Sequence, residues 1–148
     1  MRTIPYTSED LLHHHAIAAI IQNKQGEILM QEHVKYGFWT IPIGKVKQGQ
    51  QIEEALQEEL FEECDVQVEK WKEIVAKDYH YIRNEKPVTV SGHLFEILVY
   101  NGIVKNKEPD KHLVQVFLSL EKIKQLSHLS DMTLLFLETR GIQRSKSI

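Results

Sequence analysis

The sequence predicts an α/β (α+β) fold, in which helices pack against a mixed β-sheet. Apolar, often β-branched runs recur along the 148 residues and are separated by polar or glycine-containing turns. One segment in the middle of the chain has the Glu, Leu, Ala and Gln content of a helix, and two further helical segments follow near the end. An order of strands, helix, strands and helices is typical of a mixed sheet with helices packed on it.

The first half of the chain is expected to form strands followed by one helix. Three apolar runs are expected as strands: 16–21, 27–33 and 38–43. The polar turn at 23–26 should join the first two of these strands in a hairpin. A loop at 44–51 leads to the helix at 52–64. Asp65 is expected to end this helix, because aspartate tolerates the left-handed conformation.

The second half of the chain is expected to form three strands and two helices. The strands are expected at 72–79, 88–100 and 113–120, and the helices at 121–126 and 131–140. Ser130 is a suitable N-cap for the last helix, and Gly141 is a suitable residue to close it.

Length, charge and cysteine content limit the classes of protein to consider. The 148 residues fit a single domain, 1–148, that can bury a core. The net charge of -3 gives no general attraction to nucleic acid or to an anionic membrane, so binding of a phosphate compound would need a local cation. Cys64 is the only cysteine, and no apolar run resembles a signal segment or a membrane span. A soluble, cytoplasmic protein is therefore expected.

The central helix is unusually acidic. It carries six glutamates and no lysine or arginine: Glu53, Glu54, Glu58, Glu59, Glu62 and Glu63. Pairs four residues apart repel each other and destabilise a helix by about a few tenths of a kcal/mol each. Two explanations are open at this point, namely a surface helix with solvated glutamates and a metal site.

Helical spacing places some of these carboxylates toward the interior. At about 100° per residue, five side chains form one apolar arc: Ile52, Ala55, Leu56, Leu60 and Cys64. Glu59 and Glu63 point into this arc, and Glu62 lies beside them. Burying unpaired carboxylates is unfavourable, so they would be protonated, paired with basic side chains from elsewhere in the fold, or bound to a metal. Carboxylate oxygens suit Mg²⁺ or Mn²⁺.

The segment from Trp39 to Val66 resembles the Nudix box with its lead-in. The family pattern is Gly, five residues, Glu, seven residues, Arg-Glu-apolar, any residue, Glu-Glu, any residue, Gly-apolar. The matching positions are Gly44, Glu59, Leu60, Glu62, Glu63 and Val66. The strand, loop, helix and strand order of the family also extends over most of the chain. The resemblance implies a MutT-like hydrolase with an α/β/α sandwich, whose mixed central β-sheet is flanked by helices.

The resemblance also implies a reaction and a site. Water would attack a phosphorus of a nucleoside diphosphate linked to another group, most simply converting a nucleoside triphosphate to the monophosphate and pyrophosphate. Mg²⁺, for which Mn²⁺ can substitute, would be held by the Gly44 carbonyl and by three catalytic carboxylates: Glu59, Glu62 and Glu63. Gly44 and Lys45 would form the cofactor-binding start of the loop.

A second similarity lies in the loop at 106–112. It resembles the Glu-Pro-Glu-Lys segment that precedes the last strand in members acting on nucleoside triphosphates, and it makes Glu108 a further catalytic candidate. Glu59 or Glu108 would accept the proton from the attacking water. An exposed polar turn around Pro109 is the alternative for this loop.

Three box positions depart from the family pattern. Gln50 stands in place of the first Glu, Glu58 in place of Arg, and Asp65 in place of Gly. In the family the arginine orients the neighbouring glutamates, so Glu58 could raise their proton affinity or disturb the metal geometry. The retained glutamates favour an active enzyme acting on a nucleotide-like small molecule.

Two other functions remain open at the level of sequence. One is a catalytically weak or inactive Nudix-fold module that binds a nucleotide, and the other is an unrelated protein that binds a divalent ion on its acidic helix. Family analogy adds a homodimer as an expectation.

Overall fold

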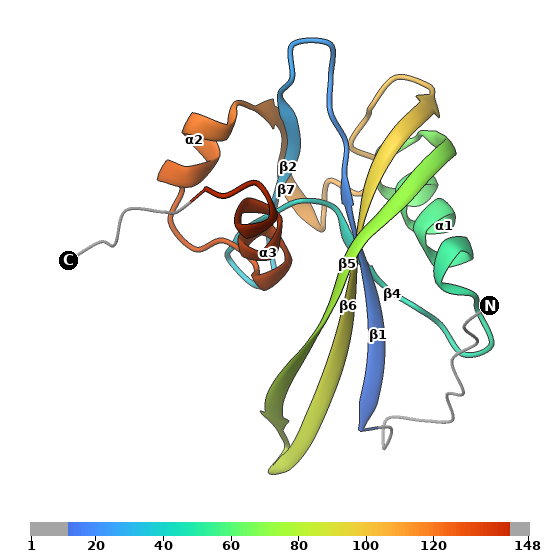
Figure 1. Cartoon of the computed structure of the whole chain (residues 1–148), viewed down its shortest axis with the longest axis vertical. Coiled ribbons are helices and arrows are strands. Elements are labelled where there is room, and N and C mark those ends of the chain that lie inside the picture. The colour runs from blue at the N-terminus through green and yellow to red at the C-terminus, as the bar shows by residue number, and fades with distance from the viewer. Residues whose placement is uncertain (1–11, 143–148) are drawn as a thin grey trace.

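Two β-sheets lie between helices in the computed structural model, which describes residues 12–142 (Figure 1). The first sheet has the strand order β4 (Ile43–Lys45), β1 (His13–Ile20), β6 (Lys86–Asn101) and β5 (Gln67–Arg83). The second has the order β3 (Trp39–Thr40), β2 (Ile28–His33) and β7 (His112–Leu118). Helix α1 (Ile52–Cys64) lies on one side, and helices α2 (Leu120–Gln125) and α3 (Asp131–Thr139) lie on the other. The expected α+β fold with helices flanking mixed β-structure is confirmed.

Strand β1 is the central strand of the molecule. It runs parallel to β6 and antiparallel to β4, so its sheet is mixed. Alternate side chains of β1 point to opposite faces. Ile17 and Ala19 belong to the core that includes α1, whereas Ala18 and Ile20 belong to the core that includes α3. Because both faces are covered there, the second half of the strand, 17–20, is buried and apolar without alternation.

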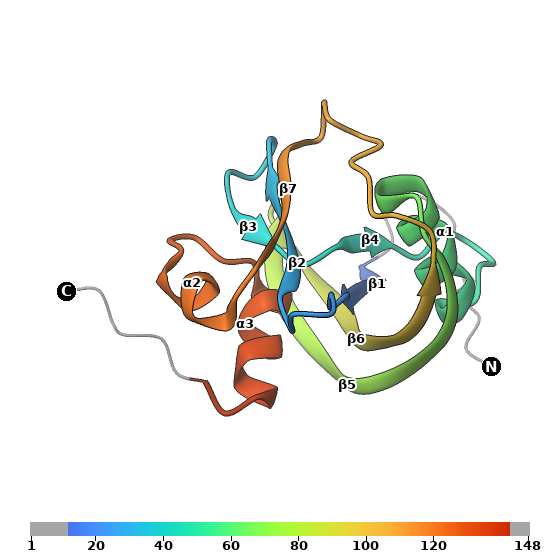
Figure 2. The ribbon, with the colours of Figure 1, turned by 90° about the horizontal axis from the view of Figure 1, so that it is seen from above.

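The hairpin expected from the first two strands forms only at its turn. The Asn23 amide donates to the Glu27 carbonyl at 3.0 Å, and the Leu29 amide donates to the Ile21 carbonyl at 2.9 Å. Beyond these bonds β1 and β2 separate and enter different sheets (Figure 2). The prediction was wrong here because each strand finds its main partner far away in the sequence: β6 for β1 and β7 for β2.

The single strand expected at 38–43 is two strands, which is a second correction. β3 pairs with β2 and β4 pairs with β1, so the chain crosses from one sheet to the other at Ile41 and Pro42. Proline has no amide hydrogen to donate to a ladder. Its carbonyl nevertheless accepts a bond from the Ala19 amide at 3.0 Å.

Strands β5 and β6 are longer than expected. β5 spans 67–83 rather than 72–79, and its pairing register with β6 shifts at three places between Val68 and Val75. Each irregularity breaks the alternation of inward and outward residues from which a strand is recognised in a sequence. The pattern of apolar and polar residues therefore did not indicate the extra length of β5.

Helix α3 is fastened to β3 by buried hydroxyl groups. The Ser130 hydroxyl caps the helix by accepting from the Thr133 amide at 3.2 Å, as expected, and it donates to the Thr40 hydroxyl at 2.8 Å. The Ile41 amide donates to the Thr133 hydroxyl at 3.0 Å. After the helix, Gly141 has the expected positive φ of 68°. Within residues 12–142, none of the helices has both the length and the apolar character that a membrane crossing requires.

Candidate metal site and substrate cleft

Helix α1 presents its three expected site glutamates at different depths. The predicted apolar arc is buried, and the Glu63 side chain is buried with it, at 0% exposure. Glu59 is half-buried one turn earlier, whereas the Glu62 side chain is exposed. Residue 62 lies about 100° around the helix from residue 63, which turns it out of the buried face. Glu59 and Glu63 therefore meet the rest of the protein, and Glu62 does not join them inside it.

The buried carboxyl group of Glu63 has several polar neighbours. Its Oε2 lies 3.2 Å from the Lys111 Nζ, and its Oε1 lies 3.7 Å from the His112 Nε2. Among the described residues, Oε1 has no hydrogen-bond partner. Burial first, and then a side-chain hydrogen bond with Glu59, raise the pKa of Glu63 to about 8. Burial also raises the pKa of Glu59.

Gly44 allows Glu59 to lie directly against the backbone of β4. A Cβ atom at position 44 would overlap the Cγ, Cδ and Oε2 atoms of Glu59. The glycine of the sequence motif is thus required by close approach and not by a positive φ. The next residue, Lys45, has an exposed side chain that lines the neighbouring cleft.

The segment between β6 and β7 covers the end of α1 and carries further polar groups to it. The Lys105 amide donates to the Cys64 carbonyl at 2.9 Å, and the Lys107 amide donates to the Glu63 carbonyl at 3.2 Å. The last carbonyls of a helix have no partner within the helix, so these bonds fasten the loop to α1. Asp65 ends the helix in the left-handed conformation, as expected, with φ of 61°.

One turn within this loop brings Glu108, Lys111 and His112 together. The amides of Lys111 and His112 both donate to the Glu108 carbonyl, at 2.9 and 3.0 Å. Residues three and four positions apart in such a turn lie on the same side. The Lys111 Nζ lies 3.9 Å from the Glu108 Oε1 as well as near Glu63.

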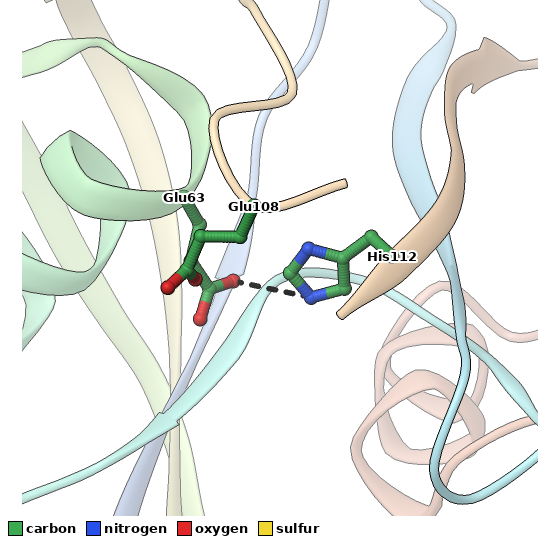
Figure 3. A group of neighbouring side chains, drawn as sticks. All are labelled: Glu63, Glu108 and His112. Atoms are coloured by element: carbon green, nitrogen blue, oxygen red, sulfur yellow. Dashed lines mark ion pairs between the residues drawn. The ribbon is translucent and has the colours of Figure 1, made fainter. Parts of the chain in front are cut away.

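Glu63, Glu108 and His112 form a compact set of potential metal ligands (Figure 3). One donor atom from each of the three lies within 4.8 Å of the other two. Burial and the charge of Lys111 lower the pKa of His112 to about 4, so its ring is neutral and can bind a cation. The unpaired Glu63 Oε1 and this set of donors fit a divalent ion.

The sequence did not single out Lys111 or His112. The available signal was the four-residue spacing of Glu108 and His112, which by itself also describes an exposed turn. Glu63 is buried because of α1, and His112 is placed by β7, so their proximity depends on the whole fold.

The departures Gln50 and Glu58 contact each other at the outer side of the site. The Gln50 Nε2 donates to the Glu58 Oε2 at 2.9 Å, and its Oε1 accepts from the Lys47 amide at 2.9 Å. The Lys47 ammonium forms an ion pair with Glu58. In the family pattern the acid is on the loop and the cation is on the helix; here the cation is on the loop and the acid is on the helix. Relative to the pattern, the charges on the loop and on the helix are reversed.

A cleft of about 590 Å³ opens beside the site. Gly44, Lys45 and Lys111 line it together with the aromatic rings of Phe38 and Tyr79. Two lysines and aromatic surfaces can hold a phosphorylated, ring-containing molecule.

A second hollow, of about 560 Å³, lies on the outer side of α1. Its lining includes Glu54, Glu58 and Glu69 but no lysine or arginine, so it would repel phosphate.

Comparison with known proteins identifies the family. The model of the NUDIX domain matches residues 12–135, which is most of the chain. The chain belongs to the NUDIX family. This NUDIX protein is accordingly a hydrolase that acts on phosphoanhydride bonds. None of the curated proteins matches it in sequence.

Solved structures share the fold of this NUDIX protein. A MutT NUDIX hydrolase from Burkholderia pseudomallei superimposes with a TM-score of 0.75 at 22% identity, over 85% of this chain and 96% of the other. The E. coli ORF135 protein gives a TM-score of 0.71 at 22% identity, over 92% and 94%. An Ap4A hydrolase from C. elegans gives 0.62 at 18% identity, over 88% and 96%. At these identities the likeness establishes the fold.

Proposed function

We propose that this NUDIX hydrolase is a divalent-metal-dependent pyrophosphohydrolase. Its substrate would be a nucleoside diphosphate linked to another group, most simply a nucleoside triphosphate that is cleaved to the monophosphate and pyrophosphate. The observation that carries this proposal is the buried Glu63 carboxyl group, whose Oε1 has no hydrogen-bond partner among residues 12–142 and faces further donors beside a cleft. Lys111 contacts only the other oxygen, Oε2, and a cation bound at Oε1 would further stabilise the buried carboxylate.

The chain's own residues have distinct proposed tasks. Glu63 and Glu108 would hold Mg²⁺ or Mn²⁺, with Glu62 and the Gly44 carbonyl completing the outer side of the site. When bound, the ion supplies charge neutralisation on the phosphate oxygens and activation of water. Lys45 would hold phosphate charge, because its side chain lines the cleft.

Glu59 is the preferred proton acceptor. It is half-buried against Gly44, and burial raises its pKa, which makes it a stronger base than a solvated glutamate. Glu108 is the second candidate for this task, because its side chain is 40% exposed in the loop over α1 and can reach water.

Further proposals concern the protein as a whole. We propose one NUDIX domain over residues 1–148, supported by the match to 12–135, and a cytoplasmic location, supported by the single cysteine. The proposed site is built from one chain and requires no second copy. The homodimer expected by analogy finds no support in the described part of the chain.

The test is release of phosphate or pyrophosphate from a panel of nucleoside triphosphates, nucleotide sugars and dinucleotides with Mg²⁺ or Mn²⁺. Glu59→Gln and Glu63→Gln each replace a carboxyl group with an amide of similar size. Glu54→Gln is the matched control, because Glu54 is exposed on the same helix and Gln keeps an acceptor for the Gln51 amide.

The proposal requires metal-dependent turnover of at least one panel member, lost by about a hundredfold or more in the first two variants and kept in the control. Nucleotide binding without turnover of any member would contradict it and would select the binding module instead.

A further inference from the structure

His112 is a buried side chain, and one of its two ring nitrogens lacks a hydrogen-bond partner among the described residues. It is 1% exposed, and this nitrogen is Nδ1. Its Nε2 is directed at the Glu63 Oε1, which has no hydrogen-bond partner among the described residues (Figure 3). Native proteins rarely leave a buried polar atom such as the Glu63 Oε1 without a hydrogen-bond partner.

The distance between these two atoms suits a shared ion better than a hydrogen bond. At 3.7 Å, Nε2 and Oε1 are beyond hydrogen-bond range. Two donors that bind one divalent ion at about 2.1–2.2 Å are separated by about 3.0–3.8 Å at the usual coordination angles. Glu108 supplies a third donor, which lies within 4.8 Å of a donor atom of Glu63 and of a donor atom of His112.

Packing alone does not account for the orientation of His112. Its ring makes an edge contact with the ring of His33, with centroids 5.5 Å apart, and this contact would be made by any aromatic ring. The direction of Nε2 toward the Glu63 carboxyl group is specific to histidine. Lys111 is compatible with an ion there, because it contacts the other oxygen, Oε2.

We propose that His112 is a metal ligand, and that its imidazole makes this site select Mn²⁺ over Mg²⁺. Mg²⁺ is bound almost entirely by oxygen, whereas imidazole nitrogen is a good ligand for transition-metal ions. A site of two carboxylates and one imidazole therefore adds more to the affinity for Mn²⁺ than to the affinity for Mg²⁺. The proposal rests on the metal dependence of the proposed function and deepens it.

The direct test is electron spin echo envelope modulation of the Mn²⁺-loaded full-length protein. We expect modulation from a directly bound nitrogen, and we expect it to change when only the histidines are labelled with ¹⁵N. This measurement needs no variant, so a folding defect cannot obscure it. It also excludes the Lys111 nitrogen as the source.

His112→Gln identifies the residue, because glutamine offers an oxygen in place of the nitrogen. The matched control is His33→Gln, which alters the neighbouring buried imidazole but not the set of donors. The nitrogen modulation should disappear in the first variant and persist in the second.

Metal titrations test selectivity without any substrate. His112→Gln should weaken Mn²⁺ binding by about tenfold or more and Mg²⁺ binding by less than about threefold. If His112 has only a structural role, His112→Gln should weaken the binding of both ions equally. That result would overturn the proposal.

The outcomes separate this proposal from the proposed function. Absence of histidine nitrogen modulation in the Mn²⁺-loaded protein would overturn the role of His112 even if the enzyme is active. Modulation with the expected selectivity would support it even if the nucleotide panel gave no turnover.

Discussion

Glu63 combines full burial with an ionisable group, and this combination controls its chemistry at the scale of the single residue. Its carboxyl group faces Glu59 on the same helix, Glu108 and Lys111 on the loop, and His112 on β7. The lysine favours ionisation, but burial and the Glu59 hydrogen bond outweigh it and raise the pKa of Glu63 to about 8. In the folded, metal-free protein the Glu63 carboxyl group therefore keeps its proton up to about pH 8.

Stability of the metal-free protein should fall as pH rises. The folded pKa of Glu63 is about 8, against an ordinary 4.5, so between these values the folded state holds a proton that the unfolded chain has released. The stabilisation is complete below the unfolded value and is lost as pH rises through the folded value. Melting temperatures in a chelator between about pH 5 and about pH 8 should decline more steeply for the natural protein than for Glu63→Gln. Parallel curves for the two proteins would disprove this explanation.

Gly44→Ala tests the close approach of Glu59 to the backbone. The added Cβ overlaps the Glu59 side chain, which must move, while the backbone at position 44 can accept alanine. Turnover should fall by about tenfold to a hundredfold because the proposed proton acceptor is displaced, with a small change in melting temperature. Gly26→Ala is the control. Gly26 lies at a turn away from the site, and its φ of +80° predicts that alanine there lowers the stability of the fold. An active Gly44→Ala protein would contradict the assigned position of Glu59.

At the scale of elements, two residues that depart from the family pattern, Gln50 and Glu58, form a contact between the loop and α1. Lys47, Gln50 and Glu58 join the two elements with charges reversed relative to the pattern. The Glu58 hydrogen bond and charge raise the pKa of Lys47, so this ion pair persists at neutral pH. The acid in place of arginine is thus neutralised locally and need not disturb Glu59 or Glu63.

Reversing the charges of Lys47 and Glu58 should show whether turnover depends on the opposite charges of this pair. Glu58→Arg places two cations together and should lower turnover by about two- to fivefold, because exposed ion pairs are weak. Lys47→Glu combined with Glu58→Arg restores opposite charges and should recover most of the activity. Steady-state kinetics at low and high salt measures this, with a smaller effect at high salt. Equal loss in the single and double variants would show that the pair has no orienting role.

At the scale of the whole molecule, the candidate site joins segments that belong to different layers. Glu63 comes from α1 on one side, Glu108 from the loop that covers it, and His112 from a strand of the second sheet. A bound ion would therefore link the helical layer to that sheet (Figure 2). Local elements alone cannot form this site.

Metal binding should consequently stabilise the whole fold. An ion at a hundred times its Kd adds about 2.7 kcal/mol, and we expect the melting temperature to rise by about 5–10 °C with Mn²⁺. Scanning calorimetry of the natural protein, Glu63→Gln and the control Glu54→Gln measures the effect. Of these three proteins, only Glu63→Gln should lack the rise in melting temperature. A rise of the same size in all three would place the stabilising ion elsewhere.

The amino-acid sequence by itself determined the local elements and the chemical character of the site. Helix α1 has its expected bounds, Asp65 and Ser130 have their expected conformational roles, and the acidic face agrees with membership of the NUDIX family. These features depend on propensities, caps and helical spacing, which act between residues close together in the chain.

Only the tertiary structure decided which groups meet. It divided the strands between two sheets, turned Glu62 outward, and brought Lys111 and His112 to Glu63. Contacts of this kind join residues far apart in the chain, and strand pairing is governed by packing against neighbours more than by local preference. The spacing of glutamates on a helix can therefore indicate a candidate metal site, but the path of the whole chain determines which histidine and which lysine lie beside it.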